Sequence, residues 1–290
     1  MSKRSYAPAA PWRTVTAAAM MMLAVVIIGQ VLNIVGVSAL QHANAQSRLY
    51  TELRLSLSEG SAPLGPVDVD GNPVALGTPL ALLHIDSLGI NEVIVEGTGS
   101  AQTMEGVGHR RDTPLPGQPG TAVLMGRSGA YGGVFRNLDK LAPGTSFTVV
   151  TGQGSAEYKV IGLRRAGDSA PAAPVAGESR LTLTTAAGAP YLPDDVLRAD
   201  ARLVSKPFAR AAQAVAPGSL PEQERALGQD MGSLWRVVLA LELLVLCVGG
   251  AVWSWFRWGK RETWMVFLPV LAAASVGVGT QFNYLLPNLL

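Results

Sequence analysis

The feature that most constrains this chain is the placement of three long apolar runs, one before and two after a middle segment of mixed polarity. A helix of about 20 apolar residues is long enough to cross the roughly 30 Å hydrocarbon core of a bilayer. The composition agrees, because only 15% of the residues are charged, against about 25% in ordinary soluble domains. We therefore expect three membrane spans around one folded domain.

Basic residues set the expected orientation of these spans. Lys3, Arg4 and Arg13 precede the first run, and a basic turn separates the second run from the third. Basic residues favour the cytoplasmic side, so the middle segment is expected to be extracellular. The predicted segments are a cytoplasmic N-terminus (1–13), a first span (14–40), an extracellular stalk (41–79), a folded domain (80–206), a linker (207–233), a second span (234–256), a cytoplasmic turn (257–263), a third span (264–287) and an extracellular tail (288–290).

A cleaved signal peptide is the alternative interpretation of the first run. Ala43-Asn44-Ala45 has the small-residue pattern of a signal-peptidase site. The apolar region of a cleavable signal is usually about 7–15 residues long, and this run is much longer. The length therefore favours an uncleaved anchor, although cleavage after Ala45 stays open.

Polar residues interrupt the outer half of each apolar run. A carboxylate that faces lipid is costly, so we expect Glu242 to face another helix and to be protonated or hydrogen-bonded there. Helix packing is the simpler interpretation, since one carboxylate without a relay makes a poor proton or ion path. The residues predicted to form this intramembrane contact are Gln30, Asn33, Glu242, Gln281 and Asn283.

The middle segment reads as a series of short strands separated by turn residues, which is typical of a closed antiparallel barrel or a sandwich. Before the strands, residues 41–79 are polar and then rich in Gly and Pro, with a short helix possible around Arg48–Leu57. The predicted strands are Leu80–Ile85, Ile90–Glu96, Thr121–Met125, Ser146–Thr151, Glu157–Leu163, Arg180–Thr185 and Ala199–Ser205.

One of these strands carries a recognisable pattern, Leu181-Thr182-Leu183-Thr184-Thr185-Ala186. It resembles the T-L-T-T-C strand of the sortases, cysteine transpeptidases of the bacterial surface whose nucleophile ends that strand. The cysteine position is Ala186 here. A methyl group cannot become a thiolate or hold a thioester, so the family's covalent chemistry has no nucleophile at this position.

Further motifs extend the resemblance in sequence order over most of residues 80–206. Ile85–Ile90 is similar to the family's I-P-x-I-G-L opening, and Gly108-His109 with Thr113–Gly120 resembles the G-H…T-x-L-P-G-E-P-G segment of class E sortases. Tyr131–Gly144 matches the Y/F-G-x-x-F-x-x-L-x-x-L-x-x-G pattern. The resemblance implies a mostly β fold, a sortase-like closed antiparallel β-barrel, to which the three transmembrane helices are added.

The departures from the family pattern fall on its chemistry. Arg127 occupies the position of the histidine in the family's G-H-R motif, and an arginine stays protonated and cannot relay a proton near neutral pH. The arginine of the family aligns with Val196, and Arg198 is a possible substitute. The resemblance therefore implies a sortase-like pseudoenzyme, not an active enzyme. Its candidate peptide-groove residues are Arg127, Ser128, Tyr131, Thr184, Thr185, Ala186 and Arg198.

A divergent transpeptidase or hydrolase that uses Ser128 or Thr185 is the alternative. A serine or threonine nucleophile needs a neighbouring base that is oriented by a third group, and the sequence places none. His109 matches a family position outside the catalytic set, so we expect it to structure a loop. His84 interrupts an apolar strand and is expected to face solvent.

The expected partners follow from topology and resemblance. The sequence predicts a multi-pass protein of a bacterial cell membrane that binds or scaffolds a membrane or surface protein, or an extended sorting-type peptide. The formal charge of +2 gives no support for a nucleic-acid partner. No cofactor or metal is expected, because the chain has one cysteine, Cys247, and three scattered histidines.

Overall fold

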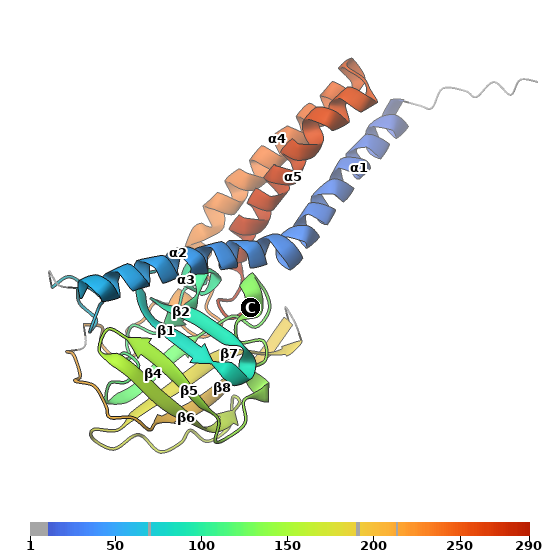
Figure 1. Ribbon diagram of the computed structural model, residues 1–290. Coiled ribbons are helices and arrows are strands. Elements are labelled where there is room, and N and C mark those ends of the chain that lie inside the picture. Colours follow the sequence, from blue (N-terminus) through green and yellow to red (C-terminus); the bar gives the residue numbers. More distant parts are fainter. Residues whose placement is uncertain (1–10, 69–70, 190–191, 213) are drawn as a thin grey trace, which may run out of the picture. The chain divides into compact units, whose positions relative to one another are not determined.

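The structure is a computed structural model of the 290-residue chain, and it describes residues 11–68, 71–189, 192–212 and 214–290. The chain forms two compact units (Figure 1). The barrel unit comprises Val37–Met231 and Tyr284–Leu290, and the helical unit comprises Gly232–Asn283 with the residues up to Gly36. The predicted cytoplasmic N-terminus, residues 1–13, lies mostly outside the described residues.

Eight strands close into a barrel in the order β1-β2-β3-β4-β7-β8-β6-β5, which confirms the predicted fold class. Two pairings differ from the antiparallel expectation, because β2 pairs with β3 and β4 pairs with β7 in parallel. The strands are β1 (Pro79–Ile85), β2 (Ile90–Glu96), β3 (Val107–His109), β4 (Gly120–Met125), β5 (Ser146–Thr151), β6 (Gly154–Arg164), β7 (Ser179–Ala189) and β8 (Leu192–Leu203).

The alternation of apolar residues explains which face of each strand is buried. In β7, Leu181 and Leu183 are fully buried in the barrel core, as the period of two requires. Thr182, Thr184 and Ala186 lie on the opposite face of the same strand. Strand β3 was missed because three residues, Val107–His109, are too short to show a pattern.

Residues 41–79, predicted as a stalk or linker, begin with a helix that packs on the barrel. Helix α2 (Ser38–Glu59) occupies the first half of this segment and lies along β1 and β2 (Figure 1). Its Leu49 and Leu53 form a buried cluster with Val93 and Val95 of β2. This spacing of four residues places both leucines on one helix face, and Gly60, with φ of 68°, ends the helix in a left-handed cap.

Helix α2 also bears on the question of signal cleavage. The bond after Ala45 lies in the interior of α2, and Ala45 is buried. On either side of it, His42 bonds Glu92, and Gln46 bonds both Val93 and Glu105. Cleavage after Ala45 would therefore remove Ser38–Ala45 from α2, and with it the contact of His42 with Glu92.

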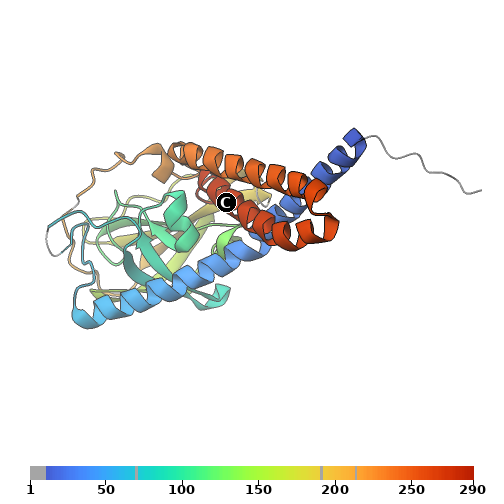
Figure 2. The same ribbon diagram turned by 90° about the horizontal axis from the view of Figure 1, so that it is seen from above.

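The helical unit contains α1 (Pro11–Leu32), α4 (Leu234–Arg257) and α5 (Lys260–Leu285), of which α4 and α5 run antiparallel (Figure 2). A short π-helical segment, Asn33–Val37, separates α1 from α2. Helices α4 and α5 are long and apolar enough to cross a membrane. In α1 the apolar stretch, Ala19–Gly29, is shorter than in α4 and α5. The third span therefore stays a prediction.

Candidate functional site around Ala186

Ala186 lies inside a β-hairpin and not at a strand end. Strand β7 continues to Ala189, and Ala186 pairs directly with Val196 of β8. The two positions that resemble the family's cysteine and arginine positions are therefore cross-strand neighbours. Arg198 pairs with Thr184, two residues further along the same ladder. The side chain of Arg198 therefore leaves the sheet at a different position from a side chain at residue 196.

Arg127 follows β4 and is held beside β7 by its neighbour Gly126. The Gly126 N–H donates to the Thr184 carbonyl at 3.0 Å, and the Thr185 hydroxyl donates to the Gly126 carbonyl at 2.8 Å. Arg127 itself is only 1% exposed. Burial lowers its pKa to about 10, so the guanidinium remains protonated at neutral pH and cannot accept a proton.

No acidic side chain among the described residues pairs with Arg127. Its Nη1 donates to the main-chain oxygen of Leu290 at 2.9 Å, and its Nη2 reaches the Ser100 carbonyl at 3.4 Å. The guanidinium also lies over the ring of Tyr131, 5.3 Å from its centre. Main-chain oxygens and an aromatic face thus take the place of the acidic side chain that a buried cation usually has.

The segment Leu286–Leu290, which includes the predicted extracellular tail at 288–290, occupies the space in front of Ala186. Leu289 is fully buried in one apolar cluster with Met125, Ala186 and Val196. Its carbonyl accepts hydrogen bonds from the Ser128 N–H at 2.9 Å and the Ser128 hydroxyl at 3.2 Å. The chain thus fills this part of its own barrel surface.

Asn288 fixes the course of the segment one residue earlier. Its side-chain amide donates to the carbonyls of Thr98 at 2.6 Å and Arg225 at 2.9 Å. Its main-chain N–H donates to the Gly228 carbonyl at 3.0 Å. Residues of the linker before α4 therefore help to hold the segment Leu286–Leu290 in place. Asn288 is bound by main-chain oxygens of the linker and of Thr98.

The hydroxyl groups proposed as substitute nucleophiles are engaged elsewhere. The Ser128 hydroxyl donates to Leu289, and the Thr185 hydroxyl donates to Gly126. None of the hydrogen bonds recorded for the described residues joins either hydroxyl to a histidine or a carboxylate, the groups that would activate it.

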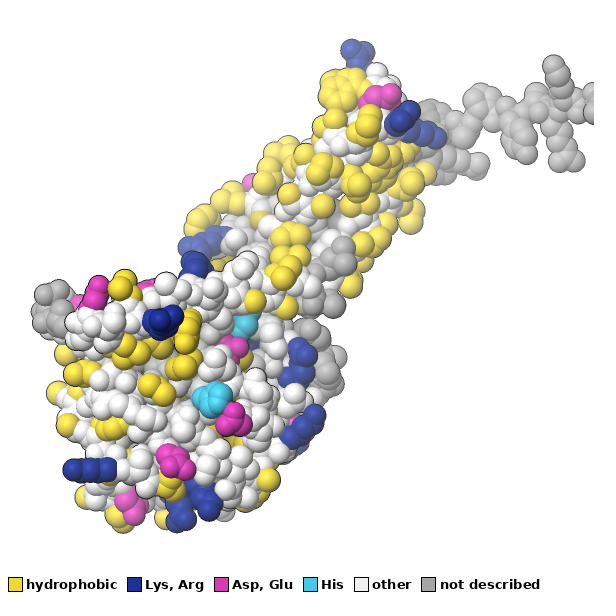
Figure 3. Space-filling view, in the orientation of Figure 1, with side chains coloured by type: hydrophobic (Ala, Val, Ile, Leu, Met, Phe, Trp, Pro, Cys, Tyr) yellow, Lys and Arg dark blue, Asp and Glu magenta, His cyan; other side chains and the backbone are white. Residues whose placement is uncertain are grey.

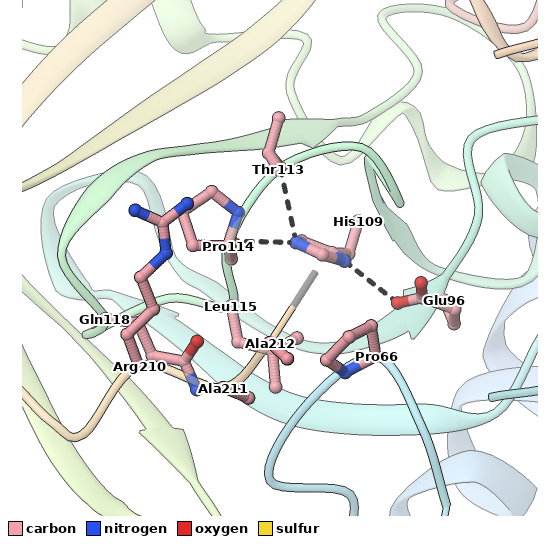
Figure 4. A pocket seen from close by; sticks show the side chains of 10 residues that line it. All are labelled: Pro66, Glu96, His109, Thr113, Pro114, Leu115, Gln118, Arg210, Ala211 and Ala212. Carbon is pink, nitrogen blue, oxygen red and sulfur yellow. Dashed lines mark hydrogen bonds and ion pairs between the residues drawn. The ribbon is translucent and has the colours of Figure 1, made fainter. Parts of the chain in front are cut away.

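His109 forms a separate buried pair with Glu96 (Figure 4). Nδ1 of His109 lies 2.9 Å from Glu96 Oε2, and Nε2 lies 3.0 Å from the Pro114 carbonyl. Burial disfavours the charged ring, but the charge and hydrogen bond of Glu96 outweigh it, so the pKa of His109 is raised. The adjoining cavity measures about 10 Å³, room for about one water. His109 thus ties the loop after β3 to β2.

An open groove of about 530 Å³ lies on the face of β4, β7 and β8 that carries Thr182 and Thr184. Arg164 is paired with Asp200 at 2.6 Å, and Arg110 with Asp112 at 2.7 Å. Arg198 has no such ion pair among the described residues. Burial and then the charge of Arg164 lower its pKa. The arginines that line the groove are Arg110, Arg164, Arg198 and Arg225.

Glu242, for which a polar contact inside the membrane was expected, is exposed on α4. Asn33 does face another helix, because it is fully buried and its amide donates to the Val276 carbonyl of α5 at 3.4 Å. Asn283 is buried, and Gln281 is half-buried. The side chain of Gln30 lies outside the described residues.

Comparisons with known proteins show what the barrel resembles. Residues 83–204 match the family model described as a sortase domain, which covers the barrel from β1 to β8 and neither α4 nor α5. This match supports a sortase-like domain in that range. No curated protein matches the chain.

Solved structures of sortases resemble the chain at low identity. A Clostridium perfringens sortase D5 transpeptidase is 20% identical, with 57% of this chain and 98% of that chain covered and a TM-score of 0.45. Sortase E from Streptomyces avermitilis is 27% identical, with 52% and 100% covered and a TM-score of 0.40. Sortase E1 from Streptomyces coelicolor, solved with a tripeptide in the active site, is 22% identical, with 45% and 91% covered and a TM-score of 0.40.

Proposed function

We propose that the chain is a membrane-anchored, non-catalytic sortase-like protein of the bacterial envelope, whose barrel binds or scaffolds a partner. The observation that carries this proposal is the packing of Leu289 against Ala186. The position that resembles the sortase nucleophile has only a methyl group and lies beneath the chain's own residues. A sorting-type peptide would have to displace Leu286–Leu290 and would then meet no thiol.

The chemistry of the surrounding side chains supports the same proposal. A transpeptidase needs a nucleophile, a proton acceptor and groups that stabilise an oxyanion. Ala186 supplies no nucleophile, and Arg127 stays protonated. Val196, where the family arginine is expected, packs in the same apolar cluster. Each of the three roles therefore lacks its usual group.

The arginine-lined groove beside Ala186 is the surface that we propose for a bound segment. Arg198 and Arg225 have no ion pair among the described residues, so the groove carries more positive than negative charge. An acidic segment of a surface protein fits this charge better than a neutral sorting peptide does. The proposed partner is therefore a carboxylate-rich stretch of an envelope protein.

The experiment separates binding from catalysis. The full chain in detergent is incubated with a sorting-type peptide and an amine acceptor, and products are sought by mass spectrometry. We expect no cleaved or transferred product. A product that disappears in Ser128→Ala or Thr185→Val would establish the enzymatic alternative instead.

Binding is measured on the same preparation with a fluorescent glutamate-rich peptide and a glutamine-rich control of equal length. We expect the acidic peptide to bind more tightly, and Arg198→Gln and Arg225→Gln to weaken it severalfold each, as lost charge-assisted contacts do. Arg54→Gln, which removes an exposed charge from α2, is the matched control and should leave binding unchanged. Equal binding of both peptides would remove the groove from the proposal.

A further inference from the structure

Helix α4 carries a carboxylate on a surface that is otherwise apolar. Glu242 is exposed, and its neighbours on the same face are exposed as well, with Val238 47% and Val245 68% accessible. Together with Leu241 and Leu246 they line a shallow groove of about 510 Å³. Figure 3 shows hydrophobic side chains over most of the visible surface of the helical unit.

The position of Glu242 along α4 keeps it away from both ends of the helix. At 1.5 Å per residue, Glu242 lies about 12 Å from Leu234 and about 22 Å from Arg257. A glutamate side chain is too short to reach the interface across such a distance. If α4 spans a membrane, as its length and composition allow, this carboxylate lies in the hydrocarbon region, where an unpartnered acid is costly.

The helical unit itself provides no counter-charge for this carboxylate among its described residues. No ion pair of Glu242 is recorded there. The other charged residues of α4 are Arg236, whose guanidinium lies over the ring of Trp235, and Arg257 at the end of the helix. None of the described side chains of this unit therefore supplies a charge that would satisfy Glu242.

A second observation on the same face points to a helix as the occupant. Gly249 follows Glu242 by seven residues, about two helical turns, and a Cβ at Gly249 would meet nothing within 4 Å. Other glycines of this unit differ in this respect, since a Cβ at Gly250 would contact Phe267 and one at Gly29 would collide with Ser275, whereas Gly36 and Gly277 are open like Gly249. Gly249 leaves a notch that permits a close approach of another backbone.

We propose that this face of α4, formed by Val238, Glu242, Val245 and Gly249, docks a transmembrane helix of a partner protein that carries a lysine or arginine at the depth of Glu242. Charge complementarity selects this occupant, because a cation satisfies the carboxylate, whereas a second copy in a symmetric pair would place glutamate near glutamate. The inference rests on the proposed membrane anchor and gives the scaffold its membrane partner.

The test uses the full chain, with Cys247→Ala and a donor fluorophore at the N-terminus, in lipid vesicles. The probes are acceptor-labelled polyleucine transmembrane peptides with a central lysine, leucine or glutamate. We expect the lysine peptide to associate with the chain about tenfold more tightly than the leucine peptide does, the range of polar contacts between model membrane helices. Glu242→Gln should remove most of this preference, and Gly249→Leu should weaken association with the lysine peptide.

The matched control moves the carboxylate off the face without deleting it. Glu242→Leu combined with Leu243→Glu keeps the composition and places the acid on the neighbouring residue, about 100° around the helix. Leu243 is also exposed, so the exchange leaves the core of the unit unchanged. This variant should lose the lysine preference. Circular dichroism of each variant checks that the barrel remains folded.

Three results would overturn the proposal. Equal association of the lysine and leucine peptides would show that Glu242 selects no cation. A lysine preference that survives in Glu242→Gln would place the contact elsewhere. Energy transfer between donor- and acceptor-labelled copies of the chain that disappears in Glu242→Gln would assign the face to a second copy. None of these readouts depends on catalysis, so they are separate from the test of the barrel.

Discussion

The barrel buries two basic side chains in different ways. His109 is 2% exposed and faces the carboxylate of Glu96 at 2.9 Å. Arg127 is 1% exposed and faces the main-chain oxygen of Leu290 and the ring of Tyr131. The first pair is made by neighbouring strands of the barrel. The second depends on the segment Leu286–Leu290, which follows α4 and α5 in the sequence and packs on the barrel.

This difference shows how a barrel surface can be closed without an ion pair between two side chains. The Glu96 carboxylate offsets the cost of burying a charged His109, so that pair contributes to folding by itself. Arg127 has no acidic side chain beside it, and its surroundings are complete only while Leu286–Leu290 is in place. The state of the surface around Ala186 is therefore coupled to one short segment, whereas the His109 loop is not.

The largest effect is expected when the His109 pair is broken. Glu96→Leu leaves His109 buried without its carboxylate, and removal of one partner of a buried pair costs about 3–5 kcal/mol. The midpoint of thermal unfolding of the full chain should fall by roughly 10 °C, at about 2–4 °C per kcal/mol for a domain of this size.

The control for this prediction is a histidine–carboxylate pair on the surface. His84 lies 2.8 Å from Asp86, but the side chain of Asp86 is 88% exposed. Asp86→Leu should change the midpoint only slightly, because exposed pairs contribute little. Equal effects of the two substitutions would contradict the claim that the His109 pair contributes more to stability because it is buried.

The second prediction concerns the segment in front of Ala186. Leu289→Ala removes a fully buried leucine, which costs about 2–5 kcal/mol. We expect this loss to appear as local opening, so hydrogen exchange should accelerate at the Ser128 amide, which donates to Leu289, by at least tenfold. Val204→Ala, at a valine that is 47% exposed, is the control and should leave this amide unchanged. Unaltered exchange at Ser128 in Leu289→Ala would mean that the segment does not protect this surface.

The sequence predicted the barrel well because its strands carry local signals. Strands such as β2 and β5 were placed with the bounds that the structure has, since alternation and turn residues lie within a few positions of one another. Helix α2 was underestimated because its apolar residues contact β2, some 40 residues away, and its polar residues resemble those of a linker.

The candidate site was only half predictable for the same reason. The pairing of Ala186 with Val196 follows from the hairpin, and Arg127 follows from the strand motif. The contact between Arg127 and Leu290 joins residues 163 positions apart, and no pattern near either residue announces it. Glu242 was expected to face a helix of its own chain, because a sequence shows that a buried acid needs a partner but not which surface provides it.

The third prediction measures the coupling between Arg127 and the segment. Arg127→Met removes the buried charge but keeps an apolar chain, so its own effect on the free energy of unfolding should be small. Because Arg127 bonds Leu290 directly, the effects of Arg127→Met and Leu289→Ala should deviate from additivity by about 1 kcal/mol. The double variant of His109→Gln with Leu289→Ala should be additive within about 0.5 kcal/mol. A coupling as large for His109 as for Arg127 would erase the distinction between the two sites.

The smallest effect is expected in the pH dependence, which separates the two cations by their titration. The pKa of His109 is raised in the folded state, because the charge and hydrogen bond of Glu96 outweigh its burial. A raised pKa means that the folded state binds the proton more tightly, so this contribution is complete below about pH 6.5 and is lost as the pH rises through the raised value. Each unit of the rise corresponds to about 1.4 kcal/mol.

The unfolding midpoint should therefore decrease from pH 6 to pH 9 in the unmodified chain, and His109→Gln should flatten part of this decrease. His42, whose pKa Glu92 also raises against the effect of burial, accounts for a further part. Arg127→Met removes no group that titrates in this range, because the Arg127 pKa of about 10 lies above it, so it should change the slope only slightly, through His42, whose pKa the charge of Arg127 lowers. Stability that rises across the same window, or a slope that Arg127→Met abolishes, would place the titrating charge beside Ala186 instead of beside Glu96.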